Sequence, residues 1–293
     1  VEFIIYSAHP LTEVMATFCV IPALVLAGDE RVSYRKYLVI GLLLGLGVVL
    51  RPHYVPAVGI AAIMIGKMNW KGIWLPMAIG GTAALVISGS TDIAFGQYPF
   101  EWFSNNYQRN IVDNVAARYG VSPFGTYFGF LAFLLSVPLL IVLTLLVRLG
   151  AKGNALLITV ALVNILIHSF IGHKEYRFIV LSTTALMLVA GNATGLLVRR
   201  AATKWPQWSS SVFTAATLSI WLAASLWRFP IFSQYDQLQP PIAAQAMDKY
   251  RNDPALCGFG VVGIHFSQIG GYSRLHRDVP LIIYQGQKTK IQP

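Results

Sequence analysis

Apolar segments of about the length of a membrane helix alternate with short polar loops along this chain. A helix needs roughly 20 apolar residues to cross about 30 Å of hydrocarbon, and most of these segments approach that length. Residues 37–50 and 55–66 are shorter, and Pro52 lies between them, where it lacks an amide donor and disfavours helix at Arg51. We therefore predict a hairpin of two short helices there. The other predicted spans are residues 11–27, 73–88, 126–147, 155–171, 178–198 and 211–227, which makes eight membrane segments in all.

The composition changes after the last predicted span. Residues 242–251 favour a helix, and residues 258–264 and 281–284 are β-like runs. We interpret residues 1–230 as a membrane region and residues 231–293 as a small extracytoplasmic domain. The expected fold class is therefore an all-α polytopic membrane protein with a small α/β tail.

Composition agrees with a membrane protein, since 55% of the 293 residues are hydrophobic, 12% are charged and the mean hydropathy is +0.59. The chain opens on Val1 without a signal peptide, and we expect a fragment that lacks its N-terminal part. The formal charge of +10 does not require nucleic acid as a partner, because the basic residues lie mostly in loops between spans. Cys19 and Cys257 offer neither a disulfide framework nor a metal-binding spacing, so no metal and no cofactor are expected.

Basic residues in the loops predict the orientation of the bundle. By the positive-inside rule, the face that collects most of them is cytoplasmic. These residues are Arg31, Arg35, Lys36, Lys67, Lys71, Arg148, Lys152, Arg199, Arg200 and Lys204. The opposite face receives His9 and Glu13, the tip formed by Arg51 and His53, the loop 91–125 and the segment 173–177. The unusual polar features are thus all predicted on the extracytoplasmic face.

The loop 91–125 carries an amphipathic pattern. Its apolar residues recur every three or four positions, at Phe100, Phe103, Tyr107, Ile111 and Val115. This spacing predicts a helix that lies in the membrane interface. Two roles remain open for it: a helix that packs over the mouth of the bundle, or one wall of a groove that admits a lipid tail.

The most polar stretch between two apolar segments reads His173-Lys174-Glu175-Tyr176-Arg177-Phe178. A charged side chain at the middle of a bilayer costs about 2.5 to 3.5 kcal/mol, so this stretch must lie at a membrane surface or face a polar cavity. Cations with several donors suit an anion held where water is scarce, because charge-assisted hydrogen bonds are about twice as strong as neutral ones. We expect a lipid-linked phosphate as the ligand. The expected phosphate-binding residues are His173, Lys174, Arg177 and Arg51.

Two acidic residues accompany these cations. Glu175 is a candidate to orient Lys174 or Arg177 or to act as an acid–base group, and the alternative is a local salt bridge without chemistry. Glu13 is a second such candidate, although its place in the first turn of a helix favours compensation of the helix dipole. His168 lies inside an apolar run, where we expect a hydrogen-bonded residue of the bundle.

The polar stretch resembles the His-Lys-Glu-x-Arg-Phe signature of glycosyltransferase family 22, the mannosyltransferases that build the glycosylphosphatidylinositol anchor and the lipid-linked N-glycan precursor. A second similarity follows Asp92, where an aromatic-Gly-x-aromatic segment, Asn114, a Tyr-Gly-x-x-Pro segment and an aromatic residue occur in the family's order. A weaker resemblance to the family's upstream helix starts is found at Ser7 to Glu13 and at Leu50-Arg51-Pro52. Asp92 thereby becomes a further orienting or acid–base candidate.

The resemblance implies a C-type glycosyltransferase fold with its active site on the lumenal or periplasmic face. It also implies a polyprenyl-phosphate sugar as donor, usually dolichyl-phosphate mannose, and a glycan or glycolipid acceptor. The protein would reside in the endoplasmic reticulum membrane of a eukaryote or the inner membrane of a bacterium. The catalytic acid that the family uses is expected upstream of Val1.

Two other classes of protein fit part of the pattern. A secondary transporter or flippase of an anionic lipid could use a helix broken at Pro52 and an outer cationic site. A noncatalytic subunit of a membrane assembly is the third interpretation. An acidic residue in a first outer loop would favour the transferase, whereas a second inverted half would favour the transporter.

Overall fold

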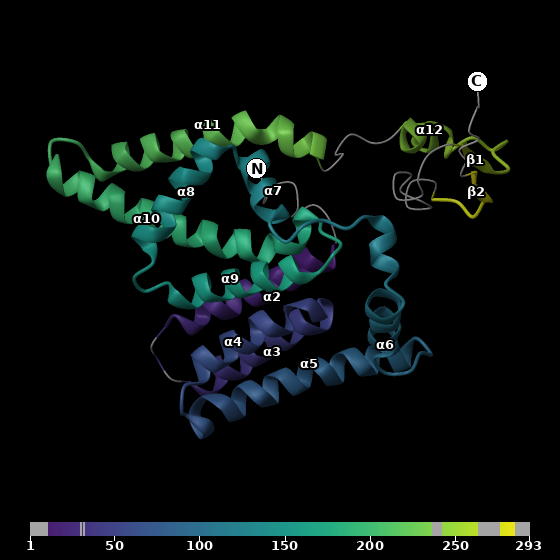
Figure 1. The fold of residues 1–293 in the computed structure, drawn as a ribbon, viewed down its shortest axis with the longest axis horizontal. Coiled ribbons are helices and arrows are strands. Elements are labelled where there is room, and N and C mark those ends of the chain that lie inside the picture. Colours follow the sequence, from purple (N-terminus) through teal and green to yellow (C-terminus); the bar gives the residue numbers. More distant parts are fainter. Residues whose placement is uncertain (1–10, 30, 32, 236–241, 263–275, 285–293) are drawn as a thin grey trace. The chain divides into compact units, whose positions relative to one another are not determined.

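The computed structural model describes residues 11–29, 31, 33–235, 242–262 and 276–284 (Figure 1). Ser7 and His9 lie outside these residues, as does the end of the predicted run 258–264. The chain divides into two compact units, Val1–Arg228 and Phe229–Pro293. The division into a membrane region and an extracytoplasmic domain stays a prediction.

Helices make up the first unit. Their bounds are α2 Thr12–Ala27, α3 Tyr34–Leu50, α4 Val55–Gly66, α5 Leu75–Ala94, α6 Glu101–Tyr107, α7 Thr126–Leu135, α8 Val137–Gly150, α9 Ala155–Phe170, α10 Val180–Lys204 and α11 Ser210–Tyr235, which continues past the unit boundary. Short 3-10 turns join them at η1 Pro52–Tyr54, η4 Val115–Tyr119 and η5 Tyr176–Ile179, and π-helical turns at η2 Trp70–Trp74 and η3 Gln108–Val112.

Three of the described helical stretches are long and apolar enough to cross a membrane. They are Trp70–Ala94, Tyr176–Lys204 and Ser210–Phe232. A bent pair, α7 and α8, makes a fourth if it is counted as one span, and three shorter apolar helices accompany them. The structure is therefore that of a mostly helical chain with candidate membrane spans, and the number of eight segments stays a prediction.

The predicted span over residues 126–147 is divided into two helices, α7 and α8. The chain bends by 105° between α7 and α8, and Ser136 at the bend has φ +70°. Pro138 in the first turn of α8 explains the break, because its ring cannot continue a helix from the residues before it. Two carbonyl oxygens near the end of α7 accept hydrogen bonds from a residue that is distant in the sequence. Arg228 donates to Leu134 O at 2.7 Å and also to Phe133 O.

Small residues allow the central helices to approach one another closely. A Cβ atom at Gly41 of α3 would lie 1.9 Å from the carbonyl oxygen of Met77, and one at Gly80 of α5 would lie 2.0 Å from that of Leu38. Close helix contacts of this kind gain dispersion energy where the surrounding lipid gives little hydrophobic drive. Helices α2, α3, α4, α9 and α10 share one buried apolar cluster. This closely packed bundle supports the polar residues at its end.

The predicted amphipathic helix of the loop 91–125 is only partly correct. Helix runs from Glu101 through α6 and η3 to Val112, and Asn114, at φ +48°, ends it. Asn adopts this left-handed conformation more readily than most residues, so the helix stops before Val115. Phe103 is 47% exposed, which leaves the apolar face of α6 uncovered within the described part of the chain.

The second unit contains a short helix and a two-stranded sheet. Helix α12 spans Ile242–Tyr250, and strands β1 Phe259–Val262 and β2 Leu281–Tyr284 pair in parallel. Met247, Val261 and Val279 form its small apolar core. The extracytoplasmic position of this unit stays a prediction.

Candidate functional site

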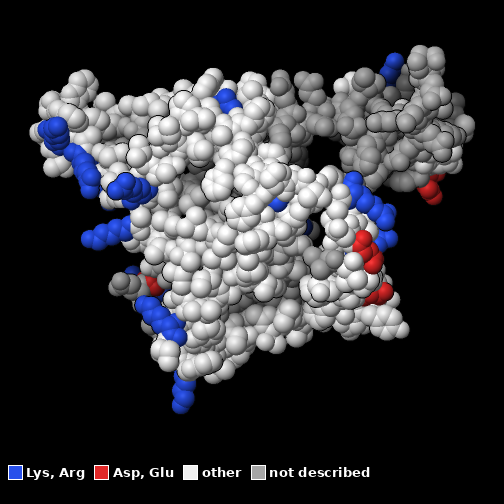
Figure 2. Space-filling model, in the orientation of Figure 1, with Lys and Arg blue, Asp and Glu red and all other residues white. Residues whose placement is uncertain are grey.

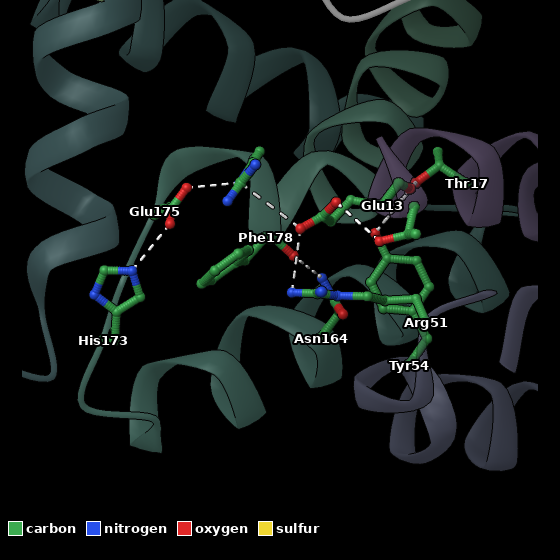
Figure 3. A network of polar contacts seen from close by, with 10 residues as sticks. Glu13, Thr17, Arg51, Tyr54, Asn164, His173, Glu175 and Phe178 are labelled. Atoms are coloured by element: carbon green, nitrogen blue, oxygen red, sulfur yellow. Dashed lines mark hydrogen bonds and ion pairs between the residues drawn. The ribbon is translucent and has the colours of Figure 1, made fainter. Parts of the chain in front are cut away.

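Three separate parts of the chain bring the polar residues together at one end of the helical bundle. Glu13 belongs to the first turn of α2, Arg51 follows the last residue of α3, and the segment 173–178 joins α9 to α10. Pro52 fixes the position of Arg51, since it begins a 3-10 turn at the point where α3 must stop. Figure 3 shows the resulting chain of contacts, in which acidic and basic side chains alternate.

The inner part of this network is a buried ion pair. Arg51 Nη2 lies 3.2 Å from Glu13 Oε1, and the two side chains are 17% and 4% exposed. The other carboxylate oxygen of Glu13 accepts a hydrogen bond from Thr12 Oγ1 at 3.2 Å. Its backbone carbonyl accepts one from Thr17 Oγ1 at 2.7 Å, and Thr17 lies 3.2 Å from the buried hydroxyl of Tyr54. Both the charge and the backbone of Glu13 are therefore held in place.

The outer part of the network is more exposed. Arg177 Nε lies 2.6 Å from Glu175 Oε2 and 3.7 Å from Glu13 Oε1, so its guanidinium bridges two carboxylates. The second oxygen of Glu175 lies 2.9 Å from His173 Nε2. The side chains of Arg177 and Glu175 are each 36% exposed, and that of His173 is 18% exposed. An anion from outside the bundle can reach Arg177 more easily than the inner pair.

Phe178 orients both arginine side chains. The guanidinium carbon of Arg51 lies 4.8 Å from the centre of the Phe178 ring, and that of Arg177 lies 5.6 Å from it. A cation near an aromatic face is stabilised by about 0.5 to 1 kcal/mol at exposed sites and by more where water is excluded. The final aromatic residue of the signature thus positions charge, a role that the sequence pattern alone did not assign to it.

Lys174 fastens the loop 91–125 instead of joining this network. Its ammonium group donates to Ser122 O at 3.0 Å and to Ile171 O at 2.7 Å, and the residue is only 7% exposed. Nearby, Ser122 N donates to Gly172 O at 2.9 Å, and His173 Nδ1 lies 3.2 Å from Gly120 O. Burial lowers the pKa of Lys174. The two segments that carry the family resemblance, 119–123 and 173–178, are therefore joined by the side chains of His173 and Lys174, and a main-chain hydrogen bond from Ser122 to Gly172 adds to this connection.

Asp92 has a local role in the structure. Its Oδ2 accepts a hydrogen bond from Phe100 N at 2.8 Å, and its backbone carbonyl accepts one from Gln97 N. These bonds close the turn between α5 and α6. Among the described residues, no hydrogen bond or ion pair links Asp92 to Arg51 or Arg177, so its acid–base role stays a prediction.

Two histidines lie near this network, and the ring of His168 lies 6.1 Å from that of Phe178. His168 is fully buried, and its Nδ1 lies 2.8 Å from Asn164 O, which confirms the prediction of a hydrogen-bonded bundle residue. The ring of His53 lies 6.0 Å from that of His168. Within the part of the chain that the structure describes, no group of three or more His, Cys, Asp or Glu residues could hold a metal ion.

Comparison with protein families gives one match that covers most of the chain. Residues 2–258 match the model of the Alg9-like mannosyltransferase family. This chain belongs to that family. The predicted resemblance to the glycosyltransferase 22 mannosyltransferases is thereby confirmed, and the network described above is the environment of the signature in an Alg9-like chain.

A curated relative is similar over a shorter segment. It is a probable Dol-P-Man:Man(7)GlcNAc(2)-PP-Dol alpha-1,6-mannosyltransferase of Schizosaccharomyces pombe, 40% identical over 73 residues. The aligned segment covers 25% of this chain and 13% of the yeast protein. No solved structure matches this Alg9-like chain.

Proposed function

We propose that this chain is part of a membrane mannosyltransferase that takes mannose from a dolichyl or other polyprenyl phosphate and transfers it to a lipid-linked or membrane-proximal acceptor. The observation that carries the proposal is the arginine pair at positions 51 and 177, which converges on Phe178 within the family signature. The name of the yeast relative supports the class of donor, since it includes dolichyl-phosphate mannose.

Arg177 is the proposed first contact for the donor phosphate. Its side chain is partly exposed, and guanidinium groups bind phosphate oxygens through two parallel hydrogen bonds. Arg51 lies deeper and would add positive charge across the Phe178 ring. When the bond between the sugar and the phosphate breaks, negative charge grows on the leaving phosphate, and fixed cations lower the energy of that state.

The acceptor hydroxyl must lose a proton during this displacement. We do not assign that step to Glu13 or Glu175, because both carboxylates are already engaged with arginine. A carboxylate outside the described residues is the proposed base. No step of this mechanism is assigned to Asp92, whose carboxylate closes a turn.

The proposed site faces the endoplasmic reticulum lumen in a eukaryote, or the periplasm in a bacterium. Lys and Arg side chains gather on the left of the space-filling view, at the end of the bundle where loops join α8 to α9 and α10 to α11 (Figure 2). The signature segment lies at the other end of the same helices, between α9 and α10. The positive-inside rule makes the basic end cytoplasmic, which supports a lumenal signature.

The test incubates membranes that hold the full-length protein with radiolabelled polyprenyl-phosphate mannose and, separately, with nucleotide-linked mannose. We expect transfer from the lipid donor. Transfer from the nucleotide sugar alone would overturn the proposal, because a soluble cytosolic donor cannot reach a lumenal site.

A conservative substitution tests the phosphate contact. Arg177→Lys keeps the charge but cannot form two parallel bonds, so the KM for the lipid donor should rise while the protein remains folded. Arg109→Lys is the matched control, since Arg109 is an exposed arginine of the loop 91–125. An unchanged donor KM in Arg177→Lys would remove Arg177 from the site.

A further inference from the structure

Glu175 is held as a bound anion would be held. One of its oxygens lies 2.6 Å from Arg177 Nε, and the other lies 2.9 Å from His173 Nε2. A carboxylate that bridges two cationic or donor groups through separate oxygens mimics the two non-bridging oxygens of a phosphate diester. The ring nitrogen of His173 that faces Glu175 is placed to donate to a phosphate oxygen in the same position.

The charges also match. A sugar attached to a polyprenyl phosphate is a phosphodiester, which carries a single negative charge. An ionised carboxylate carries the same charge. Arg51, Arg177, Glu13 and Glu175 together have no net charge, so replacing Glu175 by a phosphodiester on Arg177 would keep the network balanced. Adding the phosphodiester without displacing Glu175 would place two anions on one guanidinium, with Glu13 as a third nearby.

We propose that the Glu175 carboxylate occupies, in the empty enzyme, the position that the donor phosphodiester takes, and that the two exchange on Arg177 and His173. The proposal rests on the proposed function and assigns a place to the phosphate of its donor. Glu175 is then a competitor of the substrate, in contrast to a residue that improves substrate binding.

The inner ion pair explains why Glu175 is the carboxylate that leaves. Glu13 is 4% exposed and hydrogen-bonded by Thr12, whereas Glu175 is 36% exposed. The neighbouring Lys174 is fixed by two carbonyl oxygens, so the main chain at Glu175 can stay in place while its side chain turns toward water. Arg177 keeps Glu13 on its inner side at 3.7 Å, which holds its guanidinium in position during the exchange.

The opposite role for Glu175 predicts the opposite result. If its carboxylate orients Arg177 for the phosphate, then Glu175→Gln weakens donor binding. If its carboxylate competes with the phosphate, then Glu175→Gln strengthens donor binding, by about two- to fivefold for the loss of one partly exposed ion pair. The direction of the change therefore separates the two roles without reference to catalysis.

The experiment measures equilibrium binding of a tritiated short-chain polyprenyl phosphomannose to the purified full-length protein in detergent. A mannoside with the same lipid chain and no phosphate is the second probe. Glu175→Gln should bind the phosphodiester more tightly than the wild type and the phosphate-free mannoside equally well. The control variant Glu101→Gln removes a carboxylate of the loop 91–125 and should change neither affinity.

The results separate the exchange from the proposed donor. Equal or weaker binding of the phosphodiester by Glu175→Gln overturns the exchange and leaves the proposed donor intact. If the wild type binds the phosphodiester no better than the phosphate-free mannoside, the proposed donor falls, and the exchange falls with it. Should Glu175→Gln not yield folded protein, Glu175→Asp decides the question, because its shorter side chain loosens the grip on Arg177 and should also tighten binding of the phosphodiester, by a smaller factor.

Discussion

Substitution of Glu13 by glutamine should destabilise the bundle strongly. The change keeps the size of the side chain but leaves the guanidinium of Arg51, which is 17% exposed, without the carboxylate that now lies 3.2 Å away. Removing one partner of a buried ion pair costs about 3 to 5 kcal/mol. Glutamine can still accept a hydrogen bond through its carbonyl oxygen, so we expect about 3 kcal/mol. This is roughly a 100-fold change in the unfolding equilibrium, since about 1.4 kcal/mol corresponds to a factor of ten.

The assay is equilibrium unfolding in mixed micelles with increasing dodecyl sulfate, followed by tryptophan fluorescence. The double variant Glu13→Gln with Arg51→Met removes both charges, and it should recover about 2 kcal/mol relative to the sum of the two single changes. The remaining loss includes the contact of Arg51 with Phe178. A cost for Glu13→Gln no larger than that of Glu101→Gln, or strictly additive single effects, would refute the argument that this pair supports the fold.

Three further predictions concern the packing of α3 against α5, the attachment of the loop 91–125 and the orientation of the chain in the membrane. Gly41→Leu should separate α3 from α5 and abolish folded protein in gel filtration, because even a Cβ atom there would lie 1.9 Å from a carbonyl oxygen. Gly59→Ala should behave as the wild type, since a Cβ atom there would meet no neighbouring atom within 4 Å. Lys174→Met removes the bond from Nζ to Ser122 O and should loosen this segment, so that the Ser122 amide, which donates to Gly172 O, exchanges its hydrogen faster while exchange in α3 stays unchanged. Equal rates at Ser122 would contradict the fastening role. Cysteines placed singly at exposed positions 104 and 203 should react with an impermeant label from opposite sides of the membrane, and labelling of both from the cytoplasm would disprove the orientation.

Local patterns predicted the helices well where a single property decided the outcome. Length and apolar composition located the first helix at residues 11–27, and the structure has Thr12–Ala27. A proline predicted the end of α3 at Leu50, because the physical constraint acts on the residue directly before it. The same reasoning, applied to Pro138, would have predicted the break at Ser136, but the apolar run continued through it and hid the signal.

Partners that are distant in the sequence could not be predicted in the same way. The pattern gathered Glu13 and Arg51 on one face of the membrane, but their pairing depends on how α2 and α3 pack, which no local pattern encodes. Lys174 has the charge expected of a phosphate ligand, yet the direction of its side chain follows from the fold of residues 120–122, about 50 positions earlier. Residue type predicted the chemistry available at this site, and only tertiary packing decided which groups face each other.

The bonds that hold the loop 91–125 at Ser122 affect how sequences related to this one can diverge. Lys174 and Gly172 bind the main chain of Ser122, and any residue at position 122 would offer the same carbonyl and amide. Val121 is 69% exposed, so its side chain is likewise little restricted. Gly120, at φ +107°, has a conformation that other residues rarely adopt. Mutational drift should therefore accumulate at positions 121 and 122, while the glycine before them and the lysine that holds them are retained together.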